Sequence, residues 1–149
     1  MVTLQKSRET SRQENIFSSP NRTSKSLVLI ADDHGDSRSM VKMLLETRGY
    51  RVIEAADGED AVFVAERNCP NLILMDVTLP HLSGIDAARQ IRKIENLSRV
   101  PIVFLSGHAE ARYSEAAFAA GAADYLVKPV NLDQLGNIVD KNLKQNDKS

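Results

Sequence analysis

Short apolar segments alternate with amphipathic helical segments from residue 27 onward, and this alternation is the strongest constraint on the fold. Three of the short segments are nearly continuous runs of apolar residues: 27–31, 72–76 and 102–105. Such runs are typical of strands that are buried on both faces of a parallel sheet. Two further strands are expected at 51–55 and 124–127, and the more polar segment 51–55 is expected at an edge of the sheet.

Helical segments separate and follow these strands. Apolar residues with helical spacing predict four helices: 37–48, 58–67, 84–94 and 110–120. Asn131 is expected to cap a fifth helix. The alternation predicts an α/β fold, with a doubly wound five-stranded parallel sheet and helices on both faces. We expect one domain over residues 27–144, because an output module would need roughly sixty more residues than the polar tail 145–149 provides.

The first 26 residues differ in composition from the rest. They contain nine Ser or Thr, and five Lys or Arg against two Glu give them a net charge of +3. They hold too few apolar side chains to offset the entropy of ordering, so a disordered N-terminal tail is expected over residues 1–26. A docking arm for an acidic partner is the alternative.

The overall composition is that of an ordinary soluble domain. With 42% apolar residues, 26% charged residues and a formal net charge of −1, it gives no argument for direct binding to nucleic acid or to a membrane. No apolar stretch reaches the roughly 18 residues of a membrane span, and no secretory signal is visible. The single cysteine, Cys69, cannot form an internal disulfide and is expected to be half-buried. We therefore expect a cytoplasmic protein.

Polar side chains follow four of the expected strands. In an open α/β sheet, the carboxyl ends of the strands share one rim, where ligands bind. The residues expected there are Asp32, Asp33, Asp76, Ser106 and Lys128. Clustered carboxylates favour a hard cation such as Mg²⁺, and lysine adds a compact positive charge. This combination predicts phosphoryl transfer with Asp76 as nucleophile and with Ser106 donating to a phosphoryl oxygen.

From residue 27 to about residue 143, the chain resembles a stand-alone receiver domain of the bacterial response-regulator family. The matching motifs are Asp32-Asp33; Asp76 with Pro80 and Gly84 four and eight residues on; Ser106-Gly107; Tyr125; and Lys128-Pro129. The resemblance implies a flavodoxin-like strand order, 2-1-3-4-5, and a cis peptide bond between Lys128 and Pro129. It also implies that Asp76 accepts a phosphoryl group from a histidine kinase or a histidine phosphotransfer protein.

The same resemblance assigns roles to the other residues of the rim. Asp33, Asp76 and the backbone carbonyl of Thr78 would bind Mg²⁺, with Asp32 acting mostly through water. Lys128 would contact the phosphoryl group. A protein of this kind is not a turnover enzyme, and we expect it to catalyse only its own phosphorylation and dephosphorylation.

The family's conformational switch would couple Ser106 to Tyr125. Ser106 would move toward the phosphoryl group and Tyr125 would move from an exposed to a buried position behind it, which changes the face formed by the fourth helix, the fifth strand and the fifth helix. That face would bind a downstream target protein, or the phosphoryl group would be passed on. Thr78 and His108 are expected to tune the lifetime of the aspartyl phosphate. We expect a monomer or a weak dimer.

Two other functions stay open. A phosphorylation-independent interaction domain with the receiver fold is one, but such proteins usually lack the acidic pair or the lysine, and this chain has both. A phosphatase of the haloacid-dehalogenase-like class is the other. It would also use a strand-end aspartate, but it needs a second carboxylate two residues later, where this chain has Thr78.

Some features have more than one interpretation. The three histidines, His34, His81 and His108, all fall in loops expected at the active rim. Ordinary loop positions are the simpler interpretation, and a transition-metal site that uses imidazole ligands is the alternative. The Ala-rich fourth helix either packs closely on the sheet or presents a partner surface around Arg112 and Glu115.

Overall fold

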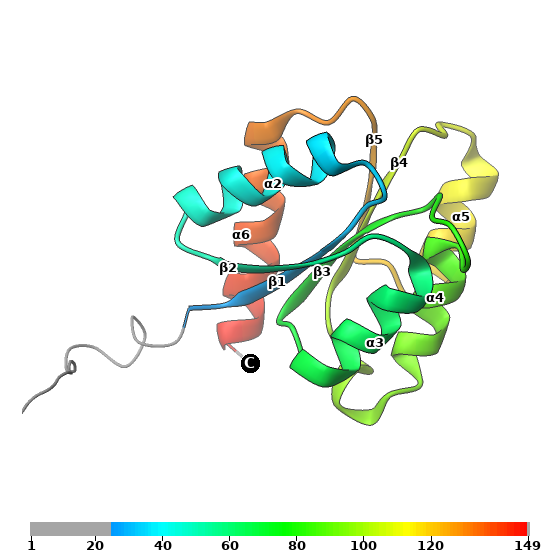
Figure 1. Cartoon of the computed structure of the whole chain (residues 1–149), viewed down its shortest axis with the longest axis horizontal. Coiled ribbons are helices and arrows are strands. Elements are labelled where there is room, and N and C mark those ends of the chain that lie inside the picture. Colours follow the sequence, from blue (N-terminus) through cyan, green and yellow to red (C-terminus); the bar gives the residue numbers. More distant parts are fainter. Residues whose placement is uncertain (1–24, 149) are drawn as a thin grey trace, which may run out of the picture.

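A five-stranded sheet forms the centre of the molecule (Figure 1). The computed structural model describes residues 25–148. Its strands are β1 (Leu27–Ala31), β2 (Arg51–Ala55), β3 (Leu72–Asp76), β4 (Ile102–Ser106) and β5 (Asp124–Val127). All pair in parallel, in the order β2-β1-β3-β4-β5, which confirms the predicted fold class and strand order. The more polar strand β2 lies at an edge, as its sequence indicated.

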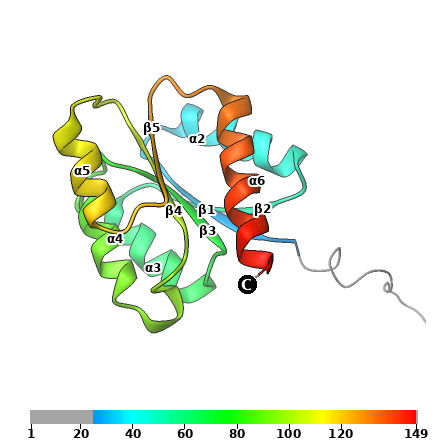
Figure 2. The ribbon, with the colours of Figure 1, turned by 180° about the vertical axis from the view of Figure 1, so that it is seen from behind.

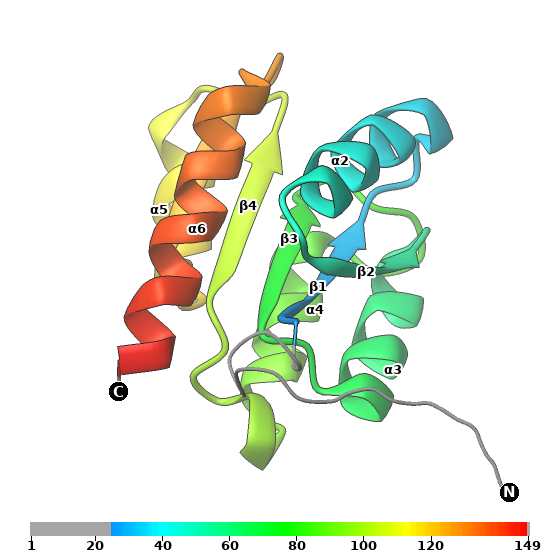
Figure 3. The same cartoon turned by 90° about the vertical axis from the view of Figure 1, so that its left-hand side faces the viewer.

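Helices cover both faces of this sheet. They are α2 (Gly35–Thr47), α3 (Gly58–Asn68), α4 (Gly84–Arg92), α5 (Ala111–Ala119) and α6 (Leu132–Lys148), with a short 3₁₀ helix, η2 (Glu95–Leu97), after α4. Figures 2 and 3 show α3, α4 and α5 on one face of the sheet and α2 and α6 on the other. Within the described part of the chain, no helix is both long enough and apolar enough to cross a membrane.

Each central strand contributes to two hydrophobic cores, because successive side chains of a strand point to opposite faces. In β3, Ile73 and Met75 belong to the core shared with α3, α4 and α5, whereas Leu72 and Leu74 belong to the core shared with α2 and α6. Phe104 of β4 is fully buried in the first of these cores. Burial on both faces explains why the central strands are apolar at almost every position.

Most helix boundaries lie within one residue of the predictions, and three differ by more. α2 begins at Gly35, two residues before the expected start. α4 ends at Arg92, because Ile94, although it packs against the core, lies in the turn that leads into η2. α6 continues to Lys148, so the segment expected to be a polar tail beyond residue 144 is helical up to that residue.

Cys69 is exposed, so the prediction of a half-buried thiol is wrong. The residue caps the C-terminus of α3 in a left-handed conformation, with φ of 48°, and this turn carries its side chain away from the core. The disordered tail predicted over residues 1–26 falls almost wholly outside the described residues, which begin at Lys25.

At the rim formed by the amino ends of β4 and β5, Arg92 joins three segments of the chain. Its guanidinium donates hydrogen bonds to the backbone carbonyls of Leu97 (3.2 Å), Val100 (2.6 Å) and Gly121 (2.7 Å). Burial lowers the pKa of Arg92, but a guanidinium stays charged in proteins. One side chain therefore holds three backbone carbonyl groups together at this end of the molecule, and the Leu97 carbonyl also accepts from the N–H of Val100.

Candidate functional site

Three polar side chains are buried at the opposite rim, where the strands end. Asp32 follows β1, Asp76 is the last residue of β3 and Ser106 is the last residue of β4. Their exposed fractions are only 2%, 4% and 0%, and among residues 25–144 no other polar or charged side chain is classed as buried. Burying a carboxylate is costly unless a positive charge or hydrogen-bond donors face it. The surrounding residues must therefore supply such partners.

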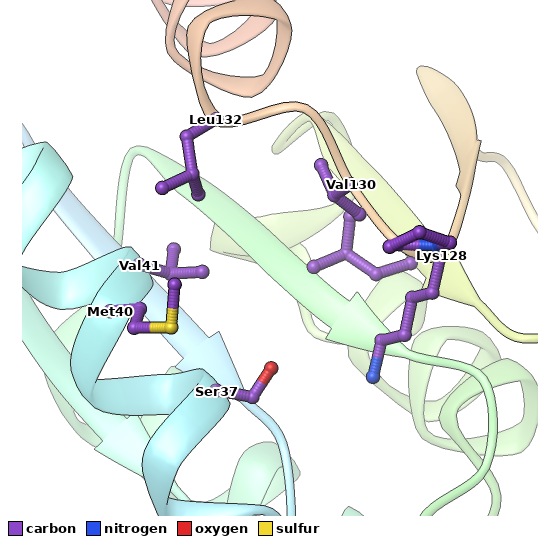
Figure 4. Close-up of a pocket in the computed structure, with 8 residues that line it drawn as sticks. Ser37, Met40, Val41, Lys128, Val130 and Leu132 are labelled. Atoms are coloured by element: carbon purple, nitrogen blue, oxygen red, sulfur yellow. The ribbon is translucent and has the colours of Figure 1, made fainter.

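Lys128, just after β5, is the cation that faces these carboxylates. Its Nζ donates to Oδ2 of Asp76 at 2.7 Å and lies 3.8 Å from Oδ2 of Asp32. Partial burial alone would lower the pKa of Lys128, but the hydrogen bond to Asp76 and the charges of Asp76, Asp32 and Asp33 outweigh it and hold the pKa above its usual value. The ammonium group therefore stays charged at neutral pH. Figure 4 shows it beside the carboxyl end of β3.

Asp32 and Asp76 also belong to a group of side chains that are able to bind a metal ion. Asp33 is partly exposed, and its Oδ1 lies 3.1 Å from Nδ1 of His34, which is also 3.4 Å from Oδ1 of Asp32. One ligand atom from each of Asp32, Asp33, His34 and Asp76 lies within 4.8 Å of the others. Oxygen ligands at such spacing are able to hold a divalent cation. Asp32, Asp33 and Asp76 are the acids that the sequence predicted at this rim, whereas His34 was expected only in a loop there.

Backbone contacts hold Asp76 in position. Its Oδ1 accepts a hydrogen bond from the backbone N–H of Thr78 at 3.0 Å. The N–H of Gly84, at the start of α4, donates to the carbonyl of Val77 at 2.9 Å. These bonds fold the segment after β3 back over the strand end. They explain why Gly84, eight residues beyond Asp76, lies against its backbone.

Arg38 of α2 supports Asp32 from behind, and the sequence did not reveal it. Its Nη1 donates to the backbone carbonyl of Asp32 at 2.6 Å, and its Nε donates to Glu54 of β2 at 2.9 Å. The hydrogen bond from Arg38, partly opposed by burial and aided by Lys42, lowers the pKa of Glu54. Arg38 therefore ties the turn after β1 to the edge strand.

Ser106 and Tyr125 both bond to the backbone of His108. The N–H of His108 donates to Oγ of Ser106 at 2.9 Å, and the Tyr125 hydroxyl donates to the carbonyl of His108 at 2.7 Å. The imidazole ring of His108 stacks on Tyr113, with centroids 4.1 Å apart. The loop after β4 therefore connects the buried serine to the half-buried tyrosine.

A cleft of about 260 Å³ opens between these groups. It is lined by Asp33, His34, Asp76, Thr78, Gly107, His108 and Lys128. His81 is exposed, with φ of 70°, and does not line the cleft. The peptide bond between Lys128 and Pro129 is cis, as expected.

A larger and mostly apolar cleft of about 490 Å³ adjoins the first. Figure 4 shows its residues, which come from α2, from the end of β4 and from the segment between β5 and the start of α6. They are Ser37, Met40, Val41, Leu105, Lys128, Pro129, Val130 and Leu132. Lys128 lines both clefts, so the apolar surface lies next to the charged one.

Comparisons with known proteins agree with this arrangement. A family model described as "Response regulator receiver domain" matches residues 28–140. The chemotaxis protein CheY of Bacillus subtilis (strain 168) is 34% identical over 117 residues, which are 78% of this chain and 96% of that protein. The transcriptional regulatory protein PdtaR of Mycobacterium tuberculosis (strain CDC 1551 / Oshkosh) is 41% identical over 110 residues, 72% of this chain and 52% of that protein.

A solved structure with a metal in its cleft is also similar. It is the receiver domain of sensor histidine kinase PA1611 from Pseudomonas aeruginosa PAO1, with a magnesium ion coordinated in the active site cleft. That domain is 37% identical, with a TM-score of 0.76, and the match covers 81% of this chain and 99% of that one. Several curated relatives are much longer, and the chain spans between 8% and 51% of the length of three of them.

Proposed function

This chain belongs to the response-regulator receiver domain family, and from that premise we propose that Asp76 is its phosphoacceptor. The donor is a histidine kinase or a histidine phosphotransfer protein. The observation that carries the proposal is the Asp76 carboxylate itself, which is buried, lies 2.7 Å from the Lys128 ammonium and opens into a cleft with Asp33. A carboxylate held in this way is positioned to act as a nucleophile.

The proposed reaction is an in-line transfer. An oxygen of Asp76 attacks the phosphorus, the bond between phosphorus and the donor's imidazole nitrogen breaks, and its electron pair returns to that nitrogen. The product is an aspartyl phosphate. Lys128 and the Ser106 hydroxyl would contact the phosphoryl oxygens, which is supported by the 2.7 Å bond from Lys128 to Asp76 and by the position of Ser106 at the end of the neighbouring strand.

The residues present fit a magnesium ion. Asp33, Asp76 and the backbone carbonyl of Thr78 would hold it, with Asp32 acting mostly through water. The fit rests on the donor set, because hard oxygen atoms at close range are the ligands that Mg²⁺ prefers. When bound, the ion supplies positive charge against the incoming phosphoryl group.

We propose that phosphorylation is read out through the loop after β4. Movement of Ser106 toward the phosphoryl group would break its bond with the His108 N–H, and the same loop holds the Tyr125 hydroxyl. The affected face consists of α5, β5 and α6. It carries two exposed apolar side chains, Phe118 and Val127, with 50% and 44% of their surface exposed, which suits a protein partner or onward phosphotransfer.

The apolar cleft beside Lys128 suits the phosphodonor protein. Met40 lines it and is 56% exposed, and Met43, one turn along α2, is 69% exposed. Flexible methionines are common on surfaces that bind other proteins. Met40→Glu should slow phosphotransfer from a protein donor and leave phosphorylation by acetyl phosphate unchanged. Equal rates from the protein donor would contradict this assignment.

The central test is phosphorylation of the full chain by acetyl phosphate with Mg²⁺, followed by intact mass. We expect about one acid-labile phosphoryl group per chain, and none in Asp76→Asn. Asp36→Asn, which alters an exposed aspartate in the first turn of α2, is the matched control and should be phosphorylated normally. Undiminished labelling of Asp76→Asn at the same site would overturn the proposal.

Two alternative functions predict different outcomes. A phosphorylation-independent interaction domain would bind its partner equally well with Asp76→Asn, which a pull-down of a purified partner would reveal. A phosphatase would turn over a phosphomonoester repeatedly. Thr78 makes the second alternative less favourable, because it offers no carboxylate two residues after Asp76.

A further inference from the structure

We propose that His34 adds an imidazole ligand to the carboxylate cluster, so that the site selects divalent transition-metal ions such as Ni²⁺ over Mg²⁺. The inference rests on the proposed cation site of the receiver domain and concerns its selectivity. It is carried by the position of Nδ1, which lies 3.1 Å from Asp33 and within the group of four ligand atoms that also includes Asp32 and Asp76.

The local backbone fixes this position. His34 is the residue that precedes α2, with φ of −97° and ψ of 109°, and its N–H donates to Oδ1 of Asp32 at 2.9 Å. This backbone hydrogen bond holds His34 directly beside the carboxylate cluster. Its side chain is 71% exposed, so the ring has room to turn its nitrogen toward an ion. His34 also lines the cleft into which the carboxylates open.

The other two histidines are not placed to do the same. His108 lines the cleft, but its ring stacks on Tyr113, and its Nδ1 lies 4.0 Å from Glu110. His81 lies outside the cleft. Since the chain has three histidines, His34 is the one imidazole that joins the carboxylates within the described residues.

Ligand chemistry then predicts the selectivity. Carboxylate, carbonyl and water ligands suit Mg²⁺, whereas imidazole suits Ni²⁺, Zn²⁺ and Cu²⁺. Among divalent ions, Ni²⁺ also stands high in the general order of affinity. A mixed site of carboxylates and one imidazole therefore gains more for Ni²⁺ than for Mg²⁺. Removing the imidazole should cost Ni²⁺ affinity and leave Mg²⁺ affinity almost unchanged.

The test is isothermal titration of the full chain, freed of metal with a chelator, with Ni²⁺ alone and with Mg²⁺ alone. We expect His34→Asn to weaken Ni²⁺ binding by about tenfold or more and to change Mg²⁺ binding by less than about twofold. Asparagine is a good residue before a helix, so the variant should fold. His81→Asn is the matched control, because asparagine tolerates its positive φ, and both affinities should stay at the wild-type values.

Two further measurements separate this inference from the proposed function. Asp33→Asn should weaken the binding of both ions. Excess Mg²⁺ should displace Ni²⁺, because the two ions share one site. If Asp33→Asn weakens Mg²⁺ while His34→Asn leaves Ni²⁺ unchanged, the role of His34 is rejected and the receiver function stands. If Mg²⁺ does not bind to the wild-type chain, the proposed function fails as well. If neither Asp33→Asn nor His34→Asn changes the Ni²⁺ affinity, Ni²⁺ binds elsewhere and the inference is overturned.

Discussion

Replacing Gly84 with alanine is expected to destabilise the protein, although the new side chain is only a methyl group. Gly84 is the first residue of α4, where it lies against the end of β3. A methyl group on it would lie 2.0 Å from the backbone carbonyl oxygen of Asp76 and 2.9 Å from the carbonyl carbon. Backbone atoms cannot rotate away as the end of a side chain can. Either α4 or the end of β3 must therefore move.

The size of this effect follows from the overlap. A Cβ atom essentially never lies closer than 3.0 Å to a neighbouring heavy atom. The 2.0 Å contact therefore requires α4 and the end of β3 to separate by about 1 Å. Overpacking of this kind costs about 1–3 kcal/mol. For a domain of this size, about 4 °C of Tm corresponds to each kcal/mol, so Tm should fall by about 4–12 °C.

Gly35→Ala is the matched control. Gly35 is the first residue of α2, and nothing lies within 4 Å of the methyl group that alanine would add there. This variant should be slightly more stable than the wild type, by about 0.4–1 kcal/mol, because alanine restricts the unfolded chain. Thermal unfolding followed by circular dichroism measures both variants. A Tm for Gly84→Ala equal to or above that of Gly35→Ala would refute the reasoning.

Three other changes test separate parts of the structure. The hydrogen bond from Arg38 holds the pKa of Glu54 below its ordinary value of 4.5, so its stabilisation is present above that pH and lost as the pH falls through the folded-state pKa. Between about pH 5 and pH 3, the free energy of unfolding measured in urea should therefore fall less in Glu54→Gln than in the wild type, by up to about 1 kcal/mol. Lys128→Gln leaves the buried carboxylates without their cation, which should lower the free energy of unfolding by about 1–3 kcal/mol. Adding Mg²⁺ should then raise the Tm of this variant more than that of the wild type, and an equal rise in both would contradict this. Phe104→Ala should cost about 3–5 kcal/mol in urea unfolding. Phe118→Ala, at a side chain already 50% exposed, should stay within about 0.5 kcal/mol, and similar losses for both would count against the assigned core.

The sheet was predictable because its central strands carry an unambiguous pattern. A segment such as 72–76 is buried at every position, and only a strand covered on both faces needs apolar residues throughout. The ends of the helices were less predictable. Ile94 continues the apolar spacing of α4, yet the chain has already turned toward η2, because spacing reports which residues face the core and not where the backbone hydrogen bonds stop.

The site divides in the same way. Asp32, Asp76 and Lys128 could be placed together from the sequence, since topology alone brings the carboxyl ends of parallel strands to one rim. The support from Arg38 could not, because it depends on how a long side chain folds back onto a backbone carbonyl. The link from Tyr125 to the loop after β4 is of the same kind, since its acceptor is a carbonyl group that any residue would supply.

At each rim of the sheet, one basic side chain faces several acceptors, and the acceptors differ in charge. This difference affects how each rim responds to ions in solution. Arg92 donates to neutral carbonyl groups, which neither titrate nor attract counter-ions. Lys128 faces carboxylates, which carry negative charge and are ligands for divalent cations. Added divalent cations should therefore act first on the rim that contains Asp76. Arg92 pairs with neutral carbonyl groups at the other rim, so the two ends of the domain would respond differently to the same ions.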